Sequence, residues 1–262
     1  GALPAEYGLR TAGIIDLKTK SGSADPAGSL SLYGGTHSTL EPSFNYGGTS
    51  GTLNYFVSAD YRANALGIES PDGQSNPRHD HTGQTHGFVF LEDILNEENR
   101  ISAVLSTSAG KFEIPTRIGL SPNLQNANGL PLIVNGQSFY PSANLDENQR
   151  EITHFAILSL QHSRGLLDVQ TSVTARYSSL TFTPDRLGDL LFNGIAQNAY
   201  KQNIAYALQS DGAYKLPDEH TLRAGVSLQT DHSRSLTQSA VIALDATGNQ
   251  LNDIPLTLLD SG

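Results

Sequence analysis

The clearest pattern in the sequence is an alternation of apolar and polar residues that recurs along the chain. It is most regular in LNYFVSADYRAN, residues 53–64, where Phe56 is the one large apolar residue among the polar positions. Because successive side chains of a strand point to opposite faces, this period of two predicts a β-strand with one apolar and one polar face. The same pattern predicts eight further strands, at residues 29–34, 40–46, 85–94, 101–109, 152–161, 167–177, 203–215 and 222–232.

The connections between these strands alternate between short and long. Short connections rich in Gly, Asn and Asp predict tight turns at residues 47–51, 96–99, 163–165 and 216–220. Long connections cover residues 65–81, 110–150, 184–200 and the chain after about 234, whereas 35–38 is a short exception. Tight turns at one end of a sheet and long loops at the other are typical of outer-membrane barrels. Loops of this length are uncommon in compact soluble domains.

Strand length and the polar positions favour the same architecture. Twelve residues rise about 40 Å, and at a tilt of about 45° they cover about 28 Å, close to the thickness of a hydrocarbon core. Charges of both signs on the polar face would be costly inside a small sandwich but are ordinary in a wide, wet lumen. The prediction is an all-β fold, part of a large antiparallel transmembrane β-barrel. The residues expected to face its lumen are Asn54, Arg62, Gln170, Arg176, Gln209, Asp211 and Gln229.

Composition narrows the range of functions. The 16 Lys and Arg against 26 Asp and Glu give a formal net charge of −10, so a nucleic-acid partner is not expected. The chain has no Cys, which excludes disulfides and thiolate metal sites. The longest apolar runs are far shorter than the roughly 18 residues of a membrane helix. No hydrolase or metalloprotease motif occurs, so we expect neither an enzyme nor a bound cofactor.

The order of the segments resembles that of TonB-dependent outer-membrane receptors. EYGLRTAGIIDLKTKSG, residues 6–22, is similar to the end of that family's plug domain, while residues 28–48 and 53–68 are similar to its first barrel strands. The resemblance implies two parts: residues 1–26 are the C-terminal end of the plug domain with a linker, and residues 27–262 are the N-terminal part of the barrel. The barrel would contribute about nine strands of a presumed 22.

The resemblance also implies a function and a location. It implies a receptor in the outer membrane of a Gram-negative bacterium that takes up a scarce ligand, such as a ferric siderophore, with energy supplied through TonB. The implied partners are outer-membrane lipid and lipopolysaccharide, an unidentified small-molecule ligand, and the TonB complex. The TonB contact would be made by a plug region before residue 1, and the remaining strands would follow residue 262, so the chain is expected to be a fragment.

Two other classes of protein fit the strand pattern. A passive porin-type barrel has no plug, so it fails if residues 1–20 lie in the lumen. A soluble extracellular β-rich protein that binds carbohydrate would place a second protein layer on the apolar face. Such a protein would stay monodisperse without detergent.

The candidate ligand-binding residues lie in two long connections. Arg117, Phe139 and Tyr140 combine a cation with aromatic rings, which suits an anionic chelate, although packing of the loop on itself is the alternative. His79 and His81, with His86 further on, offer imidazole groups to a ligand or metal. The alternative for the histidines is a polar loop that leads into a strand, and no metal site is predicted.

Three further segments have a predicted role. Arg10 of the plug-like segment is a candidate partner for the inward carboxylate of Asp60 or Asp231, and the alternative is a solvated Arg10. Residues 187–195 (LGDLLFNGI) are too apolar for a free loop, so they are expected to fold over the lumen or rest on a neighbouring loop. The paired acids at 92–93 and 97–98 flank a tight turn, which favours a solvated acidic turn over acid–base chemistry.

Overall fold

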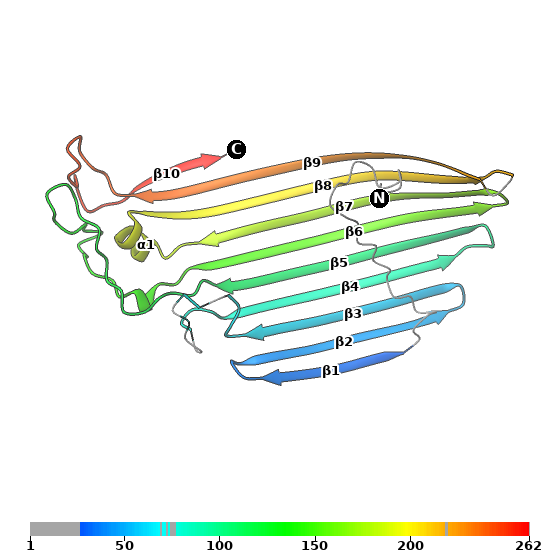
Figure 1. Ribbon diagram of the computed structural model, residues 1–262, viewed down its shortest axis with the longest axis horizontal. Coiled ribbons are helices and arrows are strands. Elements are labelled where there is room, and N and C mark those ends of the chain that lie inside the picture. Colours follow the sequence, from blue (N-terminus) through cyan, green and yellow to red (C-terminus); the bar gives the residue numbers. More distant parts are fainter. Residues whose placement is uncertain (1–26, 69, 72, 74–76, 218–219, 262) are drawn as a thin grey trace.

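The chain folds into one large antiparallel sheet (Figure 1). The structure, a computed structural model, describes residues 27–261 except 69, 72, 74–76 and 218–219. The described residues form ten strands in sequential order: β1 (Gly28–Gly35), β2 (Thr39–Ser50), β3 (Leu53–Asn64), β4 (Thr82–Ile94), β5 (Asn99–Glu113), β6 (Asn148–Arg164), β7 (Leu167–Thr183), β8 (Ile195–Lys215), β9 (Thr221–Val241) and β10 (Leu256–Ser261).

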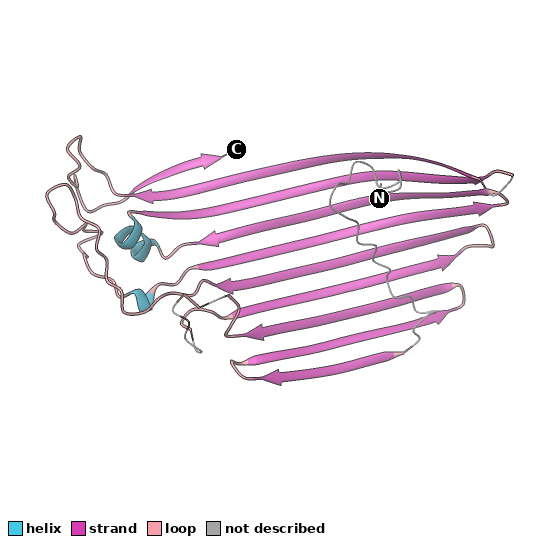
Figure 2. Ribbon diagram, in the orientation of Figure 1, coloured by secondary structure: helices cyan, strands magenta, loops and turns pink. Residues whose placement is uncertain are grey.

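The order of the strands follows from their connections. Each strand pairs with the next one along the chain, as antiparallel strands joined by short turns do. Strand length rises from 8 residues in β1 to 21 in β8 and β9. The helix α1 (Arg186–Asn193) lies at the end that carries the long loops (Figure 2). None of the described helices has the length and apolar character needed to cross a membrane.

The nine predicted strands all occur, and β3 has the bounds that its alternation predicts. The other predicted strands are longer in the structure, because backbone pairing continues beyond the residues that alternate cleanly. The described residues form one strand more than the nine that the pattern marks, since β10 makes ten. β10 lies in the region after residue 234 that the sequence pattern assigned to a loop.

The predicted turns and loops lie at opposite ends of the strands. Gly51 and Gly165, with φ of 61° and 59°, occupy the tight turns after β2 and β6, where only a residue tolerant of positive φ fits without strain. The loops of residues 65–81, 114–147, 184–194 and 242–255 lie at the other end (Figure 1). The predicted separation of short and long connections is therefore confirmed, including the short turn between β1 and β2.

Continuous register divides the sheet into two chemically different faces. Paired residues point to the same side, so a row across the strands shows the character of one face. One such row is apolar nearly throughout: Tyr46, Val57, Val89, Leu105, Ala156, Ala175, Tyr206 and Thr230. We call this side the apolar face and the opposite side the polar face.

The apolar face is not covered by a second layer of the described residues. Leu158, Val173 and Tyr206, on the interior strands β6, β7 and β8, are 49%, 51% and 53% exposed. Burying such side chains in a sandwich would require an opposing sheet, yet the described residues form a single sheet. What covers this face must therefore come from outside the described part of the chain.

A small hydrophobic core lies among the long loops instead. Leu190 and Leu191 of α1 are almost fully buried and pack with Val134 of the 114–147 loop and with Ala196 and Ala240 at the strand ends. The helix is fixed at both ends. The Asp185 side chain accepts a hydrogen bond from the Gly188 amide at 2.9 Å, and Gly194 takes the left-handed conformation that ends the helix. Of the two expectations for residues 187–195, packing on a neighbouring loop is the one that the structure shows.

Candidate functional site

The polar face carries most of the charged side chains of the strands. The register places on this face Glu41, Asp60, Arg62, Glu92, Arg100, Glu151, Asp168, Arg176, Lys201, Asp211, Lys215, Arg223, Asp231 and Asp260. Several of them pair between strands, for example Lys215 of β8 with Asp168 of β7 at 3.7 Å, and Arg176 of β7 with Asp231 of β9 at 3.9 Å, across β8. Because these groups stay partly exposed, each pair contributes little to stability, and the face as a whole is suited to contact with water.

A polar groove crosses this face near the long-loop end. Its volume is about 650 Å³, and its charged lining on the polar face comes from Glu151 of β6 and Lys201 of β8. The hydroxyl groups of Ser178 of β7 and Ser233 of β9 also line the groove, together with the Asn203 amide of β8. Asn203 donates to Ser233 Oγ at 3.0 Å, so part of the wall is fixed by its own hydrogen bonds. The groove offers a cation, a carboxylate and hydroxyl groups to a polar solute.

An aromatic patch interrupts the polar face on β3 to β6. Phe56 and Phe90 are paired across β3 and β4 and are largely buried, while Phe88 lies with its ring centroid 6.4 Å from that of Phe56. The register continues the patch with Val104 and Ile157. The alternation in the sequence marks these residues as exceptions but does not show that they gather in one place.

The seven residues predicted to face a lumen all lie on the polar face. Within a strand, either the odd-numbered or the even-numbered residues point to the polar face, and we call this the parity of that face. All seven have the parity of the polar face in their strand: Asn54, Arg62, Gln170, Arg176, Gln209, Asp211 and Gln229. Gln209 and Gln229 each donate to the carboxylate two residues further along their strand, at 2.6 Å. That this face borders a lumen stays a prediction.

The three loop residues predicted to bind a ligand do not form one cluster. Arg117 is exposed and Phe139 is 62% exposed, whereas Tyr140 packs against the loop core. The Tyr140 hydroxyl donates to Asp185 Oδ2 at 2.6 Å. Burial, followed by this hydrogen bond to Asp185, raises the pKa of Tyr140 to about 12. Tyr140 therefore fixes the loop, and Arg117 and Phe139 remain the members of this set that a ligand can reach.

The histidines are held in separate interactions. His79 Nε2 lies 3.4 Å from the Ala143 carbonyl oxygen, His81 Nδ1 lies 3.1 Å from that of Asn64, and His86 Nδ1 lies 2.9 Å from Asp60 Oδ1. Among the described residues, no group of three or more His, Cys, Asp or Glu side chains is arranged to hold a metal ion.

Asp80, between the two loop histidines, is the residue whose role the sequence analysis missed. Its side chain is almost fully buried, and Oδ1 accepts a hydrogen bond from the Ile68 amide at 2.7 Å. Burial raises the pKa of Asp80, and the hydrogen bond from Ile68 opposes that shift. The carboxyl group ties the loop after β3 to the start of β4. In the sequence, only the position of Asp80 between two histidines in a loop indicates a role for it, and that pattern was assigned to ligand binding by the histidines.

The two carboxylates proposed to meet the plug have partners within the sheet. Asp60 contacts His86 at 2.9 Å and Arg62 at 3.8 Å, and Asp231 lies 3.9 Å from Arg176. Arg10, their predicted partner, lies outside the described residues, as does the whole of the predicted plug segment 1–26. The predicted plug contact therefore remains a prediction.

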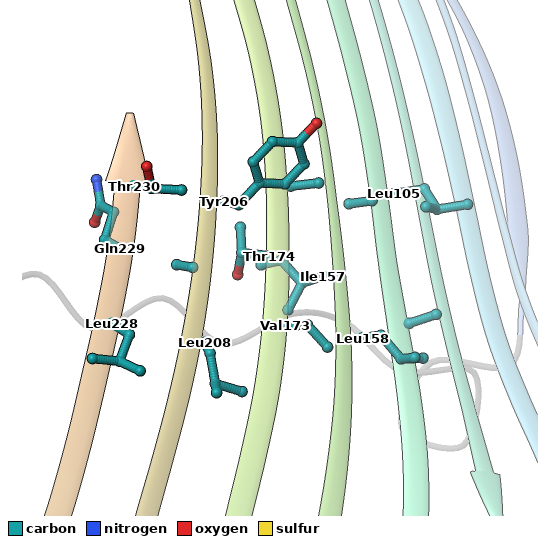
Figure 3. A pocket seen from close by; sticks show the side chains of 14 residues that line it. Leu105, Ile157, Leu158, Val173, Thr174, Tyr206, Leu208, Leu228, Gln229 and Thr230 are labelled. Carbon is teal, nitrogen blue, oxygen red and sulfur yellow. The ribbon is translucent and has the colours of Figure 1, made fainter. Parts of the chain in front are cut away.

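The apolar face carries a shallow hollow of about 650 Å³ (Figure 3). Large side chains surround it, among them Leu105, Leu158, Tyr206 and Leu228. The alanines that also line it lack bulk, so they leave the depression between these larger side chains. A hollow with this lining has little to offer a polar solute and suits hydrocarbon.

A pair of carboxyl groups joins α1 to the neighbouring loop. The Asp189 side chain is almost fully buried and is hydrogen-bonded to Glu147. Burial, followed by the hydrogen bond to Glu147 and the nearby charges of Glu147 and Asp185, raises the pKa of Asp189 to about 8, while the hydrogen bond from Asn193 acts in the opposite direction. Asp189 therefore keeps its proton near neutral pH and can donate it to the Glu147 carboxylate.

Comparison with known proteins gives only distant structural similarity. A scan against protein-family models and a search of curated proteins each found no match. Among solved structures, the RagAB peptide importer in its "closed-closed" state is similar, with a TM-score of 0.49 and 11% identity over 86% of this chain. The ferric yersiniabactin uptake receptor FyuA from Yersinia pestis is similar with a TM-score of 0.39 and 14% identity over 91% of this chain.

The chain spans only 28% and 43% of the length of those two structures. At these identities, and with both TM-scores below 0.5, the likeness shows neither the family of this chain nor the ligand that it binds.

The Asp189–Glu147 contact predicts that docking of α1 depends on pH. The pKa of Asp189 is about 8 when α1 is docked, against 3.8 for an ordinary Asp. Its contribution to docking is therefore complete below about pH 4 and is lost as the pH rises toward 8. We expect the protection factor of the Gly194 amide, which bonds to the Leu190 carbonyl in the last turn, to fall over this range. In Asp189→Asn this decline should largely disappear, and an unchanged decline would contradict the assignment.

Proposed function

We propose that this chain forms part of the wall of a transmembrane barrel in the outer membrane of a Gram-negative bacterium. The supporting observation is the separation of charge between the two faces. The outward strand charges lie along the two edges of a band across the sheet. Asp93 and Arg164 lie on the short-turn edge, and Lys111, Glu113, Arg150 and Arg234 lie on the long-loop edge. Between them, the apolar face carries no Asp, Glu, Lys or Arg within the described strands.

The height of this charge-free band matches a bilayer. From Arg150 to Arg164, β6 rises roughly 46 Å, and at a tilt of about 45° it covers roughly 33 Å along the membrane normal. A hydrocarbon core is about 30 Å thick. Paired backbone groups within the sheet also meet the requirement that no peptide group face lipid without a hydrogen bond. Hydrocarbon is thus the covering that the apolar face is suited to.

We further infer that the barrel is a receptor of the TonB-dependent kind that takes up a scarce ligand, such as a ferric siderophore. The sequence supports this inference, because residues 6–22 followed by residues 28–48 resemble the junction of plug and barrel in that family. The groove at Glu151 and Lys201 and the exposed Arg117 and Phe139 are the candidate ligand contacts. Energy from TonB and anchoring by outer-membrane lipid and lipopolysaccharide belong to the same proposal.

The membrane assignment predicts that the same substitution has opposite outcomes on neighbouring residues of β7. Val173→Arg places a charge near the middle of the apolar band and should destabilise the inserted state by about 2–4 kcal/mol. Thr174→Arg places the same charge on the polar face and should be tolerated. Assembly in the outer membrane is measured by heat-modifiable migration on gels. Equal assembly of the two variants would contradict a lipid-facing Val173.

The transport assignment is tested by uptake. A strain without the complete reading frame should grow more slowly when one ferric siderophore is the iron source, and growth should return when the gene is restored. Testing several iron sources, cobalamin and oligosaccharides in turn identifies the ligand class. Unchanged growth and uptake for all of them would contradict a receptor role, and a defect that persists with the gene restored would do so as well.

A further inference from the structure

Two cations lie side by side at the edge of the apolar face. Lys111 of β5 pairs directly with Arg150 of β6 in the register, and both side chains are exposed. Their parity in the two strands is that of Leu105 and Leu158, so they point to the apolar side of the sheet. They lie near the ends of β5 and β6 that lead into the long loop of residues 114–147.

The pair is electrostatically unfavourable by itself. Directly opposed residues of an antiparallel pair have Cβ atoms about 4.5–5.5 Å apart, and like charges there are destabilising. Neither cation has an ion-pair partner within the part of the chain that the structure describes. The outward acid on the same strand, Glu113, accepts a hydrogen bond from the His81 amide at 3.0 Å. An anion from outside the described sheet would remove the repulsion.

The position of the pair indicates which anion is suited to it. At the opposite edge of the apolar band, the outward Arg164 is already paired with Glu98 at 3.4 Å. At the long-loop edge, Lys111 and Arg150 are joined on the same face by Arg234 of β9. Cations without an ion-pair partner among the described residues therefore lie along one edge of the band, directly beside apolar rows that suit acyl chains.

We propose that Lys111 and Arg150 bind the phosphate of an anionic lipid headgroup in the leaflet on the long-loop side. The inference rests on the proposed membrane location. Arg offers a planar pair of donors and Lys a compact charge, and both suit phosphate oxygens. The lipid tails would lie on the apolar rows below, which a free phosphate ion cannot use. This distinction is the reason to assign the site to a lipid.

The sheet offers a matched control for the test. Lys201 of β8 is exposed like Lys111, and it lies one residue away from the row that contains Lys111, Arg150 and Tyr200. Its parity places it on the polar face. Lys111→Gln and Lys201→Gln therefore remove the same charge at nearly the same height on opposite faces.

The experiment measures lipid A retained by the purified protein, expressed from its complete reading frame, after washing in a neutral detergent. A cation near an anionic lipid surface contributes about 1 kcal/mol, so Lys111→Gln should reduce retention about fivefold and the double variant with Arg150→Gln about 25-fold. Lys201→Gln should leave retention unchanged. Displacement of lipid A by inorganic phosphate at matched phosphate concentration would assign the site to free phosphate and overturn the proposal.

A stability measurement gives a second readout. In phosphatidylcholine vesicles, Lys111→Gln should leave the unfolding midpoint unchanged or raise it, because the variant removes a like-charge contact. In vesicles that also contain lipid A, the same substitution should lower the midpoint. The same sign in both vesicles, or equal effects for Lys111→Gln and Lys201→Gln, would overturn the lipid site. If the protein inserts into the vesicles and either of these two outcomes is found, only the lipid site is contradicted. If the protein does not insert at all, the proposed function is contradicted.

Discussion

Continuous cross-strand pairing is the interaction on which the rest of this structure depends. Each strand continues the register of the one before it, from β1 to β10, without an exchange of strand order. As a result, the parity of a residue in its strand decides which face it occupies. A slip of one residue in any pair would transfer every side chain of that strand to the other face. The division between an apolar and a charged face is thus set by the backbone and requires no contact between distant side chains.

The loop end of the sheet is held by a different set of interactions. Carboxyl groups hold the loop segments together: the half-buried Asp185 caps α1 and accepts from Tyr140, and the buried Asp80 accepts from the Ile68 amide. In the last long loop, Asp245 accepts from the Asn249 amide and the Thr247 hydroxyl, and these bonds lower its pKa. Many exposed polar groups still line these loops, so a ligand would meet a folded surface with defined positions.

The sequence predicts the interior of the sheet better than its ends. In β3, every position serves one face or the other, so the alternation gives the bounds of the strand. At the ends of β8 and β9, the chain leaves the region where one face must be apolar, and backbone pairing alone defines the strand. β10 has too few residues for its alternation to stand out, although its pairing with β9 is clear in the structure.

The same distinction applies to the candidate site. Parity was sufficient to place Gln170, Arg176 and Gln229 on the polar face, because one neighbour in the strand fixes the direction of the next. It could not separate Phe139 from Tyr140, which are adjacent in a loop but differ in burial. Their difference comes from Asp185 and from the core around α1, both distant in sequence. Contacts of that range carry no local signal.

In the proposed barrel, lipid covers the apolar face and water meets the polar face. Because the chain has no Cys, single cysteines can be introduced along residues 167–177 of β7 and spin-labelled without a background signal. In lipid vesicles, collisions of the label with oxygen and with a water-soluble nickel chelate should alternate with a period of two, with oxygen dominant at the odd-numbered positions. Chelate access that is equal at odd and even positions, or low oxygen access at both, would contradict the account.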